Sequence, residues 1–284
     1  GQQYAEHTPE YVDLYDVESS DKGYEEFVQI TGFGLAPVKA QGAPAVYDSE
    51  TQGPVTRAVH VSYALGYIVT HEELSDNQYM EVSANRARSN ARAFRQTKER
   101  VAAANFNRAT NASYTWADGK TMLATDHPNT SGGTFSNKLS VAADLSEASL
   151  EDLCIQIMQA TDDRGMLINL MPQSLHVAPA NWFEATRILN TTLQVGTANN
   201  DINAIKALGI FPKGVKMNHY FTVPKQWFVR TNIERGKGLV FLQREEMSFE
   251  RDNDFGTKNA LALGYERYSC TLVDPRAVYG SEGP

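Results

Sequence analysis

The stretch from residue 70 to residue 111 contains neither glycine nor proline, the two residues that most often break a helix. It opens with Thr70-His71-Glu72-Glu73, a capping box in which Thr70 and Glu73 can each bond the other's backbone amide. A single helix over 70–111 would be about 60 Å long, whereas a compact sphere of this chain length would be only about 50 Å across. The sequence therefore predicts a flat or elongated subunit that meets neighbours in an assembly.

One face of this predicted helix carries a narrow apolar stripe with a spacing of three to four residues. Most of its members are alanine, which allows another backbone to approach closely but buries little area. The stripe consists of Leu74, Ala84, Ala87, Ala91, Phe94 and Val101.

Basic residues occupy the remaining surface of the predicted helix. A solvated helix face explains them, and so does a surface that makes salt bridges between subunits or faces DNA. The basic residues are Arg86, Arg88, Arg92, Arg95, Lys98 and Arg100, of which Arg86, Arg88, Arg92 and Arg95 are the candidates for inter-subunit or inner-surface contacts.

The bulk composition is that of an ordinary globular protein, with 42% hydrophobic and 21% charged residues. No run approaches the roughly 18 apolar residues that cross a bilayer, and we expect neither a membrane segment nor a signal peptide. A net charge of -8 argues against a dedicated nucleic-acid binder. Cys154 and Cys270 lie far apart in apolar contexts, which predicts buried thiols and not a disulfide, as in a reducing cytoplasm.

The N-terminal third is predicted to be an arm followed by a ribbon. Residues 1–25 are acidic and rich in tyrosine, and Tyr4, Tyr11, Leu14 and Tyr15 could anchor this arm to a neighbour. Residues 27–38 and 55–69 have strand-like patterns, with a glycine- and proline-containing tip between them. Because an isolated two-stranded ribbon is marginal in water, this one must lie on other protein, most economically on a second copy of the chain.

The rest of the chain mixes helices and strands without a βαβ rhythm, so the predicted fold class is α+β. A hairpin is predicted over 114–123, turning at Asp118-Gly119. Helices are predicted at 146–163, where Ser146 caps the start and Leu150, Leu153, Ile157 and Met158 are buried, and at 182–190. Strands are predicted at 175–177, 216–223, 227–232, 239–243, 247–250, 259–265 and 269–273.

Motifs for catalysis, cofactors and metals are missing from the sequence. There is no HExxH, paired CxxC, Walker-type glycine loop or GxSxG elbow, and Gly32-Phe33-Gly34 is followed by strand-like sequence and a proline instead of a helix. His127, between Asp126 and Pro128, is expected to order a loop. The chain is therefore not expected to be an enzyme or to carry a cofactor. A hydrolase with a diffuse site is the alternative from a different class.

The order of these parts resembles the major capsid protein of tailed bacteriophages, which has the HK-97-type fold. The resemblance extends from Tyr4 to Ser281, with weaker support from Gly119-Lys120, His127-Pro128-Asn129 and residues 178–189. Its most specific part is the C-terminal series Phe249-Glu250-Arg251-Asp252-Asn253-Asp254-Phe255, Thr257-Lys258-Asn259, Tyr265-Glu266-Arg267-Tyr268 and Asp274-Pro275-Arg276-Ala277-Val278-Tyr279-Gly280.

The resemblance implies a division of the chain into the parts of such a subunit. These are an N-terminal arm (1–25), an extended loop that reaches over a neighbouring subunit (26–69), the spine helix with part of the peripheral domain (70–145), an axial domain (146–238) and the C-terminal strands of the peripheral domain (239–284).

Some members of the family cross-link their subunits covalently by an isopeptide bond. That bond joins a lysine of the extended loop to an asparagine, assisted by a glutamate seven residues beyond the asparagine. The resemblance makes Lys39, Asn259 and Glu266 the candidates here. Hydrogen bonding within a strand and a salt bridge from Glu266 to an arginine are the alternative explanation of the same residues.

The function implied is that of a structural capsid protein that self-assembles as hexamers and pentamers into an icosahedral shell around double-stranded DNA. Its expected partners are copies of itself, portal, scaffold and decoration proteins of the same virion, and the packaged DNA, bound non-specifically. Its expected location is the virion capsid, assembled in the host bacterial cytoplasm. The alternative is an encapsulin-type shell protein of a cellular nanocompartment, which shares the fold.

Overall fold

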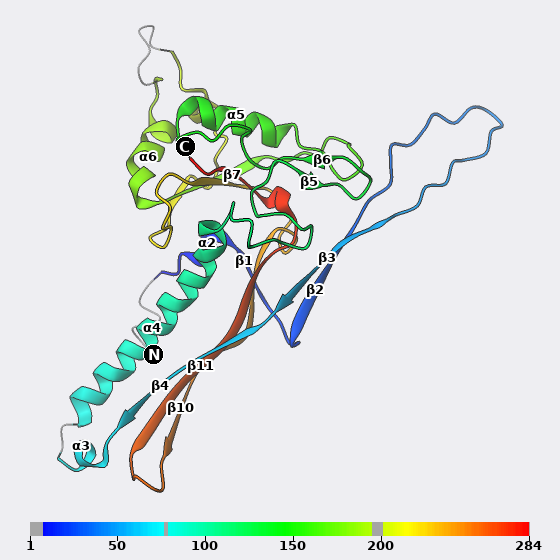
Figure 1. Cartoon of the computed structure of the whole chain (residues 1–284). Helices are drawn as coiled ribbons and strands as arrows, with labels where there is room; N and C mark the ends of the chain where they lie inside the picture. The colour runs from blue at the N-terminus through cyan, green and yellow to red at the C-terminus, as the bar shows by residue number, and fades with distance from the viewer. Residues whose placement is uncertain (1–7, 77–78, 195–200, 284) are drawn as a thin grey trace. The chain divides into compact units, whose positions relative to one another are not determined.

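The computed structural model describes residues 8–76, 79–194 and 201–283, and the chain falls into two compact units (Figure 1). The first unit comprises Gly1–Glu25, Ala58–Ala104 and Val240–Thr271. The second comprises Glu26–Arg57, Asn105–Leu239 and Leu272–Pro284. Each unit has its own four-stranded sheet.

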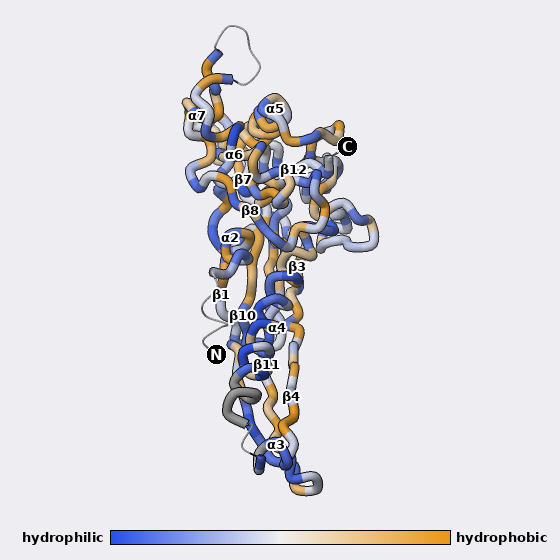
Figure 2. Tube along the Cα trace, turned by 90° about the vertical axis from the view of Figure 1, so that its left-hand side faces the viewer, coloured by the Kyte–Doolittle hydropathy of each residue, from blue (hydrophilic) through white to orange (hydrophobic). Residues whose placement is uncertain are grey.

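The sheet of the first unit has the strand order β1-β10-β11-β4. Its strands are β1 (Asp16–Ser19), β10 (Leu239–Asn253), β11 (Ala260–Leu272) and β4 (Val61–Val69). β1 runs parallel to β10, and β11 runs antiparallel to β4. Figure 2 shows β4, an edge strand of this sheet, as a mostly hydrophobic run. β10 and β11 are each continuous, whereas the sequence predicted two shorter strands in place of each.

The predicted single helix over 70–111 is wrong, because the structure contains two helices, α3 (His71–Ser75) and α4 (Tyr79–Asn107). The capping box is confirmed: the Glu73 amide donates to Thr70 Oγ1 at 3.3 Å, and the Thr70 amide donates to Glu73 Oε2 at 3.2 Å. α3 ends where the Ser75 hydroxyl donates to the Glu72 carbonyl, since serine competes for backbone groups and favours helix ends. With 29 residues, α4 is about 44 Å long.

α4 packs on one face of the sheet in the first unit. Ala91 and Phe94 of the predicted stripe are buried, and the Asn90 side chain donates to the Leu65 carbonyl of β4 at 2.8 Å. Gly264 of β11 lies against Phe94, so closely that a Cβ there would be 2.6 Å from the ring. The side chains of Leu74 and Ala84, also in the stripe, lie outside the described residues.

The N-terminal segment is part of the first unit from residue 8 onward, which corrects its interpretation as an extended arm. It forms the short helix α2 (Tyr11–Leu14) and then β1, and both Leu14 and Tyr15 are buried within their own chain. The Tyr15 hydroxyl donates to the Ala102 carbonyl of α4 at 2.9 Å. Tyr4 lies outside the described residues.

Glu99 of α4 anchors this segment. Its carboxylate accepts the backbone amides of Glu10 and Tyr11 at 2.8 and 2.9 Å, at the start of α2. Burial raises the pKa of Glu99, and the two amide hydrogen bonds oppose that shift. The segment is therefore bound through a buried carboxylate as well as through apolar side chains.

The second unit is built on a sheet with the strand order β12-β9-β7-β8. Its strands are β12 (Val278–Ser281), β9 (Trp227–Thr231), β7 (Pro172–Val177) and β8 (Val215–Met217). Helices α5 (Glu147–Met158), α6 (Trp182–Asn190) and α7 (Ala204–Leu208) belong to the same unit. Its core is a cluster of buried side chains that includes Leu150, Leu153, Cys154, Ile157, Leu175, Val177, Ile188, Trp227, Val229 and Tyr279.

Several sequence predictions for the second unit are confirmed, and others are wrong in extent. α6 matches its predicted range, and Ser146 caps α5, but α5 ends at Met158, whose side chain is 40% exposed instead of buried. The strand predicted over 216–223 is the much shorter β8. The turn at Asp118-Gly119 exists, with the Trp116 amide bonded to the Lys120 carbonyl at 2.8 Å, but the structure gives residues 114–123 no strands.

The structure pairs the strands of the predicted ribbon differently. β2 (Tyr24–Ile30) pairs with β3 (Gln52–Val59), and β4 leaves β3 after His60 to pair with β11 instead. Residues 31–51 therefore form a longer connection than predicted, without regular strands. We call this connection the extended-loop tip.

Candidate assembly surfaces

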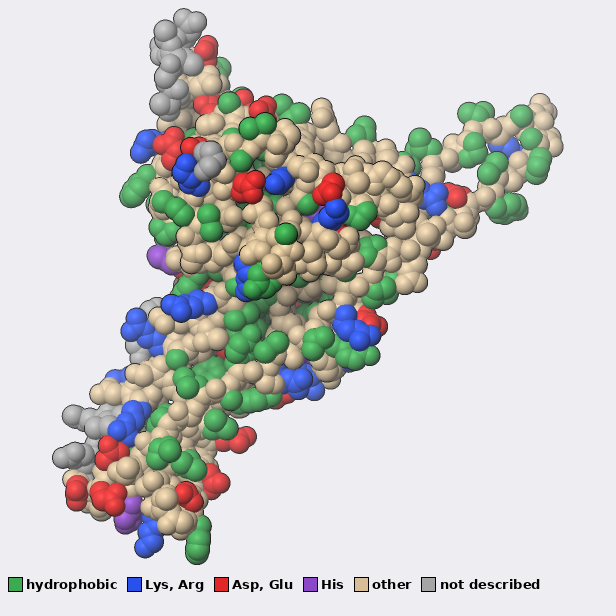
Figure 3. Space-filling model, in the orientation of Figure 1, with side chains coloured by type: hydrophobic (Ala, Val, Ile, Leu, Met, Phe, Trp, Pro, Cys, Tyr) green, Lys and Arg blue, Asp and Glu red, His purple; other side chains and the backbone are tan. Residues whose placement is uncertain are grey.

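The extended-loop tip presents apolar side chains to solvent. Figure 3 shows hydrophobic side chains along the part of the chain that projects at the upper right. Burying such side chains is favourable by about 1.5–3 kcal/mol each, so a surface that covers them would be stabilised. The exposed apolar residues of the tip are Phe33 (56%), Leu35 (84%), Val38 (100%), Val46 (74%) and Tyr47 (94%).

A polar clasp at Asp48 ties the two limbs of the tip to the turn at residues 162–166. Asp48 Oδ2 accepts the Gly34 amide at 2.8 Å and the Arg164 guanidinium at 2.8 Å. Arg164 also donates to the Ser49 carbonyl at 2.5 Å. The amides of Gly34 and Ser49, followed by Arg164, lower the pKa of Asp48. No pattern in the sequence predicts this clasp, because Asp48 and Arg164 are 116 residues apart.

Of the four arginines predicted as contact residues on α4, two are bonded within the first unit and two are exposed without an ion-pair partner among the described residues. Arg86 makes a two-pronged ion pair with Glu73 at 2.9 and 2.8 Å, and Arg95 donates to the Thr8 carbonyl at 3.1 Å. Arg88 and Arg92 are exposed, and neither has an ion-pair partner in the described part of the chain. Arg88 and Arg92 are therefore the two that are available to another molecule.

Lys98 does not lie on the helix surface as the sequence predicted. Its ammonium is 2.8 Å from the Glu266 carboxylate of β11, and the two side chains are 7% and 0% exposed. The ammonium and the carboxylate can both be buried because each neutralises the charge of the other. Lys98 is thus a core residue of the first unit.

The three candidates for a covalent cross-link are not brought together within the first unit. Glu266 is buried against Lys98, while Asn259 Oδ1 accepts the backbone amide of His71 at 3.1 Å. Asn259 lies just before β11 begins at Ala260, seven positions from Glu266 in the chain. Lys39 is exposed in the extended-loop tip of the second unit. The cross-link stays a prediction.

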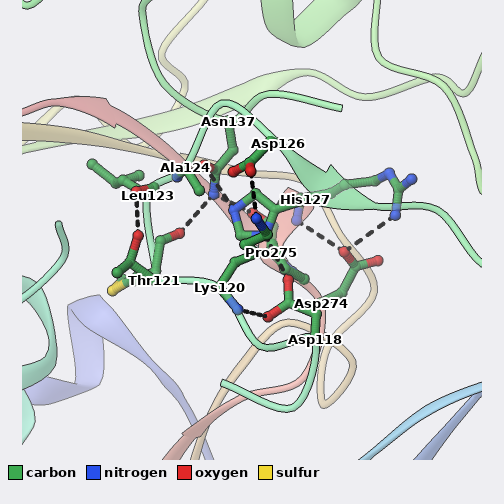
Figure 4. A network of polar contacts seen from close by, with 12 residues as sticks. Asp118, Lys120, Thr121, Leu123, Ala124, Asp126, His127, Asn137, Asp274 and Pro275 are labelled. Carbon is green, nitrogen blue, oxygen red and sulfur yellow. Dashed lines mark hydrogen bonds and ion pairs between the residues drawn. The ribbon is translucent and has the colours of Figure 1, made fainter. Parts of the chain in front are cut away.

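His127 orders the segment that follows α4 (Figure 4). Its ring is fully buried, with Nδ1 2.6 Å from the Asp118 carboxylate and Nε2 3.1 Å from Asn137 Oδ1. The Asn137 amide donates to the carbonyls of Met122 and Val278 at 2.7 and 3.1 Å. With both ring nitrogens bonded inside the protein, His127 has the loop-ordering role predicted from the sequence.

The described residues offer no group of three or more His, Cys, Asp or Glu side chains that could hold a metal ion. None of the described helices is both long enough and apolar enough to cross a membrane. Cys154 and Cys270 are free thiols, and burial raises the pKa of Cys154 to about 12, far from the range of a reactive thiolate.

Comparison with solved structures identifies the class of fold. The capsid of a native GTA particle matches with a TM-score of 0.60 and 12% identity, covering 95% of this chain and 88% of that one. The capsid of the cyanophage P-SCSP1u matches with a TM-score of 0.58 and 10% identity, covering 96% and 87%. A virus-like particle from Pyrococcus furiosus matches with a TM-score of 0.54 and 12% identity, covering 99% and 94%. No curated protein matches the sequence.

The chain has the HK-97-type capsid fold: a long helix packed on a strand hairpin, a second unit built on its own mixed sheet, and a projecting loop. This confirms the predicted fold class. The sequence profile of the phage capsid protein family matches residues 54–281. The chain belongs to this family and is a capsid shell protein, as the resemblance in its sequence implied.

Proposed function

We propose that this chain is the major head protein of a tailed phage, which assembles as hexamers and pentamers into an icosahedral shell around double-stranded DNA. Family membership supports a capsid role, and the exposed apolar side chains of the extended-loop tip carry the proposal of self-assembly. A monomer that stayed in solution would leave these side chains in water at a cost in free energy. A neighbouring subunit is the most economical cover for them.

The same chain must fit both five-fold and six-fold surroundings in a closed shell. Compact units that keep their packing, joined to neighbours by adaptable loops, meet this need because the loops absorb the difference in geometry. Each contact can be weak, since a subunit in a shell is held by many neighbours at once. Portal, scaffold and decoration proteins of the same virion are the other proposed partners, and assembly is proposed to occur in the host cytoplasm.

The proposed role is structural and not enzymatic. The buried, hydrogen-bonded state of His127 and the raised pKa of Cys154 support this proposal, because neither group is placed to react with a substrate. An isopeptide bond between Lys39 and Asn259 would be a self-modification only. Boiled shells run on a denaturing gel test it, and a single band near the mass of one chain, 31.5 kDa, would exclude the bond.

The proposal is tested by replacing Leu35, Val38, Val46 and Tyr47 with serine in the full chain. Sedimentation and electron microscopy should show free subunits in place of shells, because the tip no longer gains from burial. A matched variant with Leu35→Met, Val38→Ile and Val46→Ile keeps the apolar surface and should still assemble. Normal shells from the serine variant would refute the role given to the tip.

An encapsulin-type compartment would form a similar particle, so assembly alone does not separate it from a phage head. The contents of particles isolated from their native source make the distinction. The proposal predicts packaged double-stranded DNA. A protein cargo without a genome would favour the compartment.

A further inference from the structure

The exposed face of α4 carries arginines that no described carboxylate neutralises. Arg88, Arg92 and Arg100 are all exposed, and none of them has a carboxylate partner among the described residues. They share that face with the uncharged Asn85 and Ser89. In Figure 3, Lys and Arg side chains follow the left-hand edge of the molecule, where Figure 1 places α4.

Three described carboxylates near α4 are already engaged. Glu73 is paired with Arg86, Glu266 with Lys98, and Glu99 accepts two backbone amides of the N-terminal segment. The positive charge of the three arginines is therefore not cancelled by these neighbours. This local excess is notable in a chain whose net charge is -8.

The spacing of these three arginines along α4 also favours a ligand with regularly repeated negative charge. Arg88 and Arg92 are about 6 Å apart along the helix axis, and Arg100 lies about 12 Å beyond Arg92, since each residue adds about 1.5 Å. Duplex DNA carries a phosphate about every 3.4 Å along each strand, so three arginines on a straight rod can each reach a phosphate. Arginine also binds phosphate oxygens in a two-pronged geometry.

We infer that Arg88, Arg92 and Arg100 form a phosphate-binding surface for the duplex DNA enclosed by the shell, which places this face of α4 on the inner wall. The inference rests on the proposed function and specifies which residues make the contact. Compared with the contact residues predicted from the sequence, the surface includes Arg100. It excludes Arg86 and Arg95, which bond Glu73 and the Thr8 carbonyl. With only three arginines per subunit the contact is weak and independent of base sequence, so the genome can move along the wall.

The test measures binding of dissociated full-length subunits to a 30-base-pair duplex at a series of salt concentrations. Removing one phosphate contact lowers the slope of log affinity against log salt by about 0.9. The variant with Arg88→Gln, Arg92→Gln and Arg100→Gln should therefore lose about 2.7 from the slope. A control variant with Arg57→Gln, Arg187→Gln and Lys237→Gln changes the net charge equally but removes exposed, ion-paired groups, and it should keep the slope of the wild type.

An unchanged slope in the α4 variant would overturn the inference. If that variant also loses binding to polyglutamate, the surface is assigned to an acidic protein instead of DNA. Shell formation is scored separately by electron microscopy: shells without α4-dependent DNA binding refute only the inference, whereas the absence of shells from the wild-type chain refutes the proposed function.

Discussion

The Lys98 ammonium of α4 lies 2.8 Å from the Glu266 carboxylate of β11, in a site where both side chains are almost completely excluded from solvent. The pair fixes the position of the helix along the strand, because any other alignment would leave a buried charge without its counter-charge. The Lys98 ammonium also lies 5.2 Å from the centre of the Tyr268 ring, whose face attracts a cation. This buried pair therefore helps to define the packing of α4 on its sheet.

Lys98→Met should be among the most destabilising substitutions in the first unit. It leaves Glu266 buried beside an apolar side chain, and breaking a buried pair in this way costs about 3–5 kcal/mol. Urea unfolding of dissociated subunits measures the loss. Arg100→Met, on the exposed face of the same helix, should change stability by no more than about 0.5 kcal/mol. Equal effects of the two substitutions would contradict the role given to the pair.

Gly264→Ala should destabilise the same unit through a steric clash. A Cβ at Gly264 would lie 2.6 Å from the Phe94 ring and 3.1 Å from Asn90 Oδ1, so α4 would have to move away from β11. Overpacking of this kind costs about 1–3 kcal/mol. The double variant with Phe94→Leu should recover part of the loss, because the smaller side chain makes room. If Phe94→Leu and Gly264→Ala instead add independently, the close contact is not the cause.

Asp48→Asn should loosen the base of the extended-loop tip. The pKa of Asp48 is lowered in the folded state, so its ionised form is favoured there, and its contribution is present above the unfolded value of about 3.9. That contribution disappears as the pH falls through the lower, folded value. Hydrogen-exchange protection of residues 31–51, corrected for intrinsic rates, should fall below pH 4 in the wild type. The variant should show low protection at every pH, and wild-type protection that is independent of pH would argue against the clasp.

His176 should make the second unit sensitive to acid. Burial lowers its pKa to about 3, with Arg230, Lys216 and Lys213 adding to the shift. The unfolded state binds the proton more readily, so stability is complete above about pH 6.5 and declines as the pH falls from there toward 3. At pH 5 the loss from this group is about 2 kcal/mol. In His176→Gln, the decrease in unfolding free energy between pH 7.5 and pH 5 should be smaller by that amount, and an identical decrease would exclude His176 as the cause.

The sequence predicted local features well wherever a short motif determines them. The capping box at Thr70, the range of α6 and the turn at Asp118-Gly119 depend on residues close in the chain, and all three occur in the structure. The fold class followed from the order of elements together with the C-terminal strings. These are signals that a single sequence can carry.

Features that depend on distant residues could not be predicted. The sequence gives no reason to separate Lys98 from the other basic residues of α4, because its partner Glu266 is far away in the chain. The break between α3 and α4 was missed because serine and aspartate are tolerated inside helices as well as at their ends. The split between β3 and β4 was missed since strand pattern alone does not reveal which partner a strand takes.

Electron microscopy of the purified, expressed chain distinguishes a shell protein from a solitary subunit. We expect closed particles of uniform size whose surface shows clusters of six subunits and clusters of five. A population that remains monomeric at high concentration, with the apolar side chains of the extended-loop tip covered by its own chain, would contradict it.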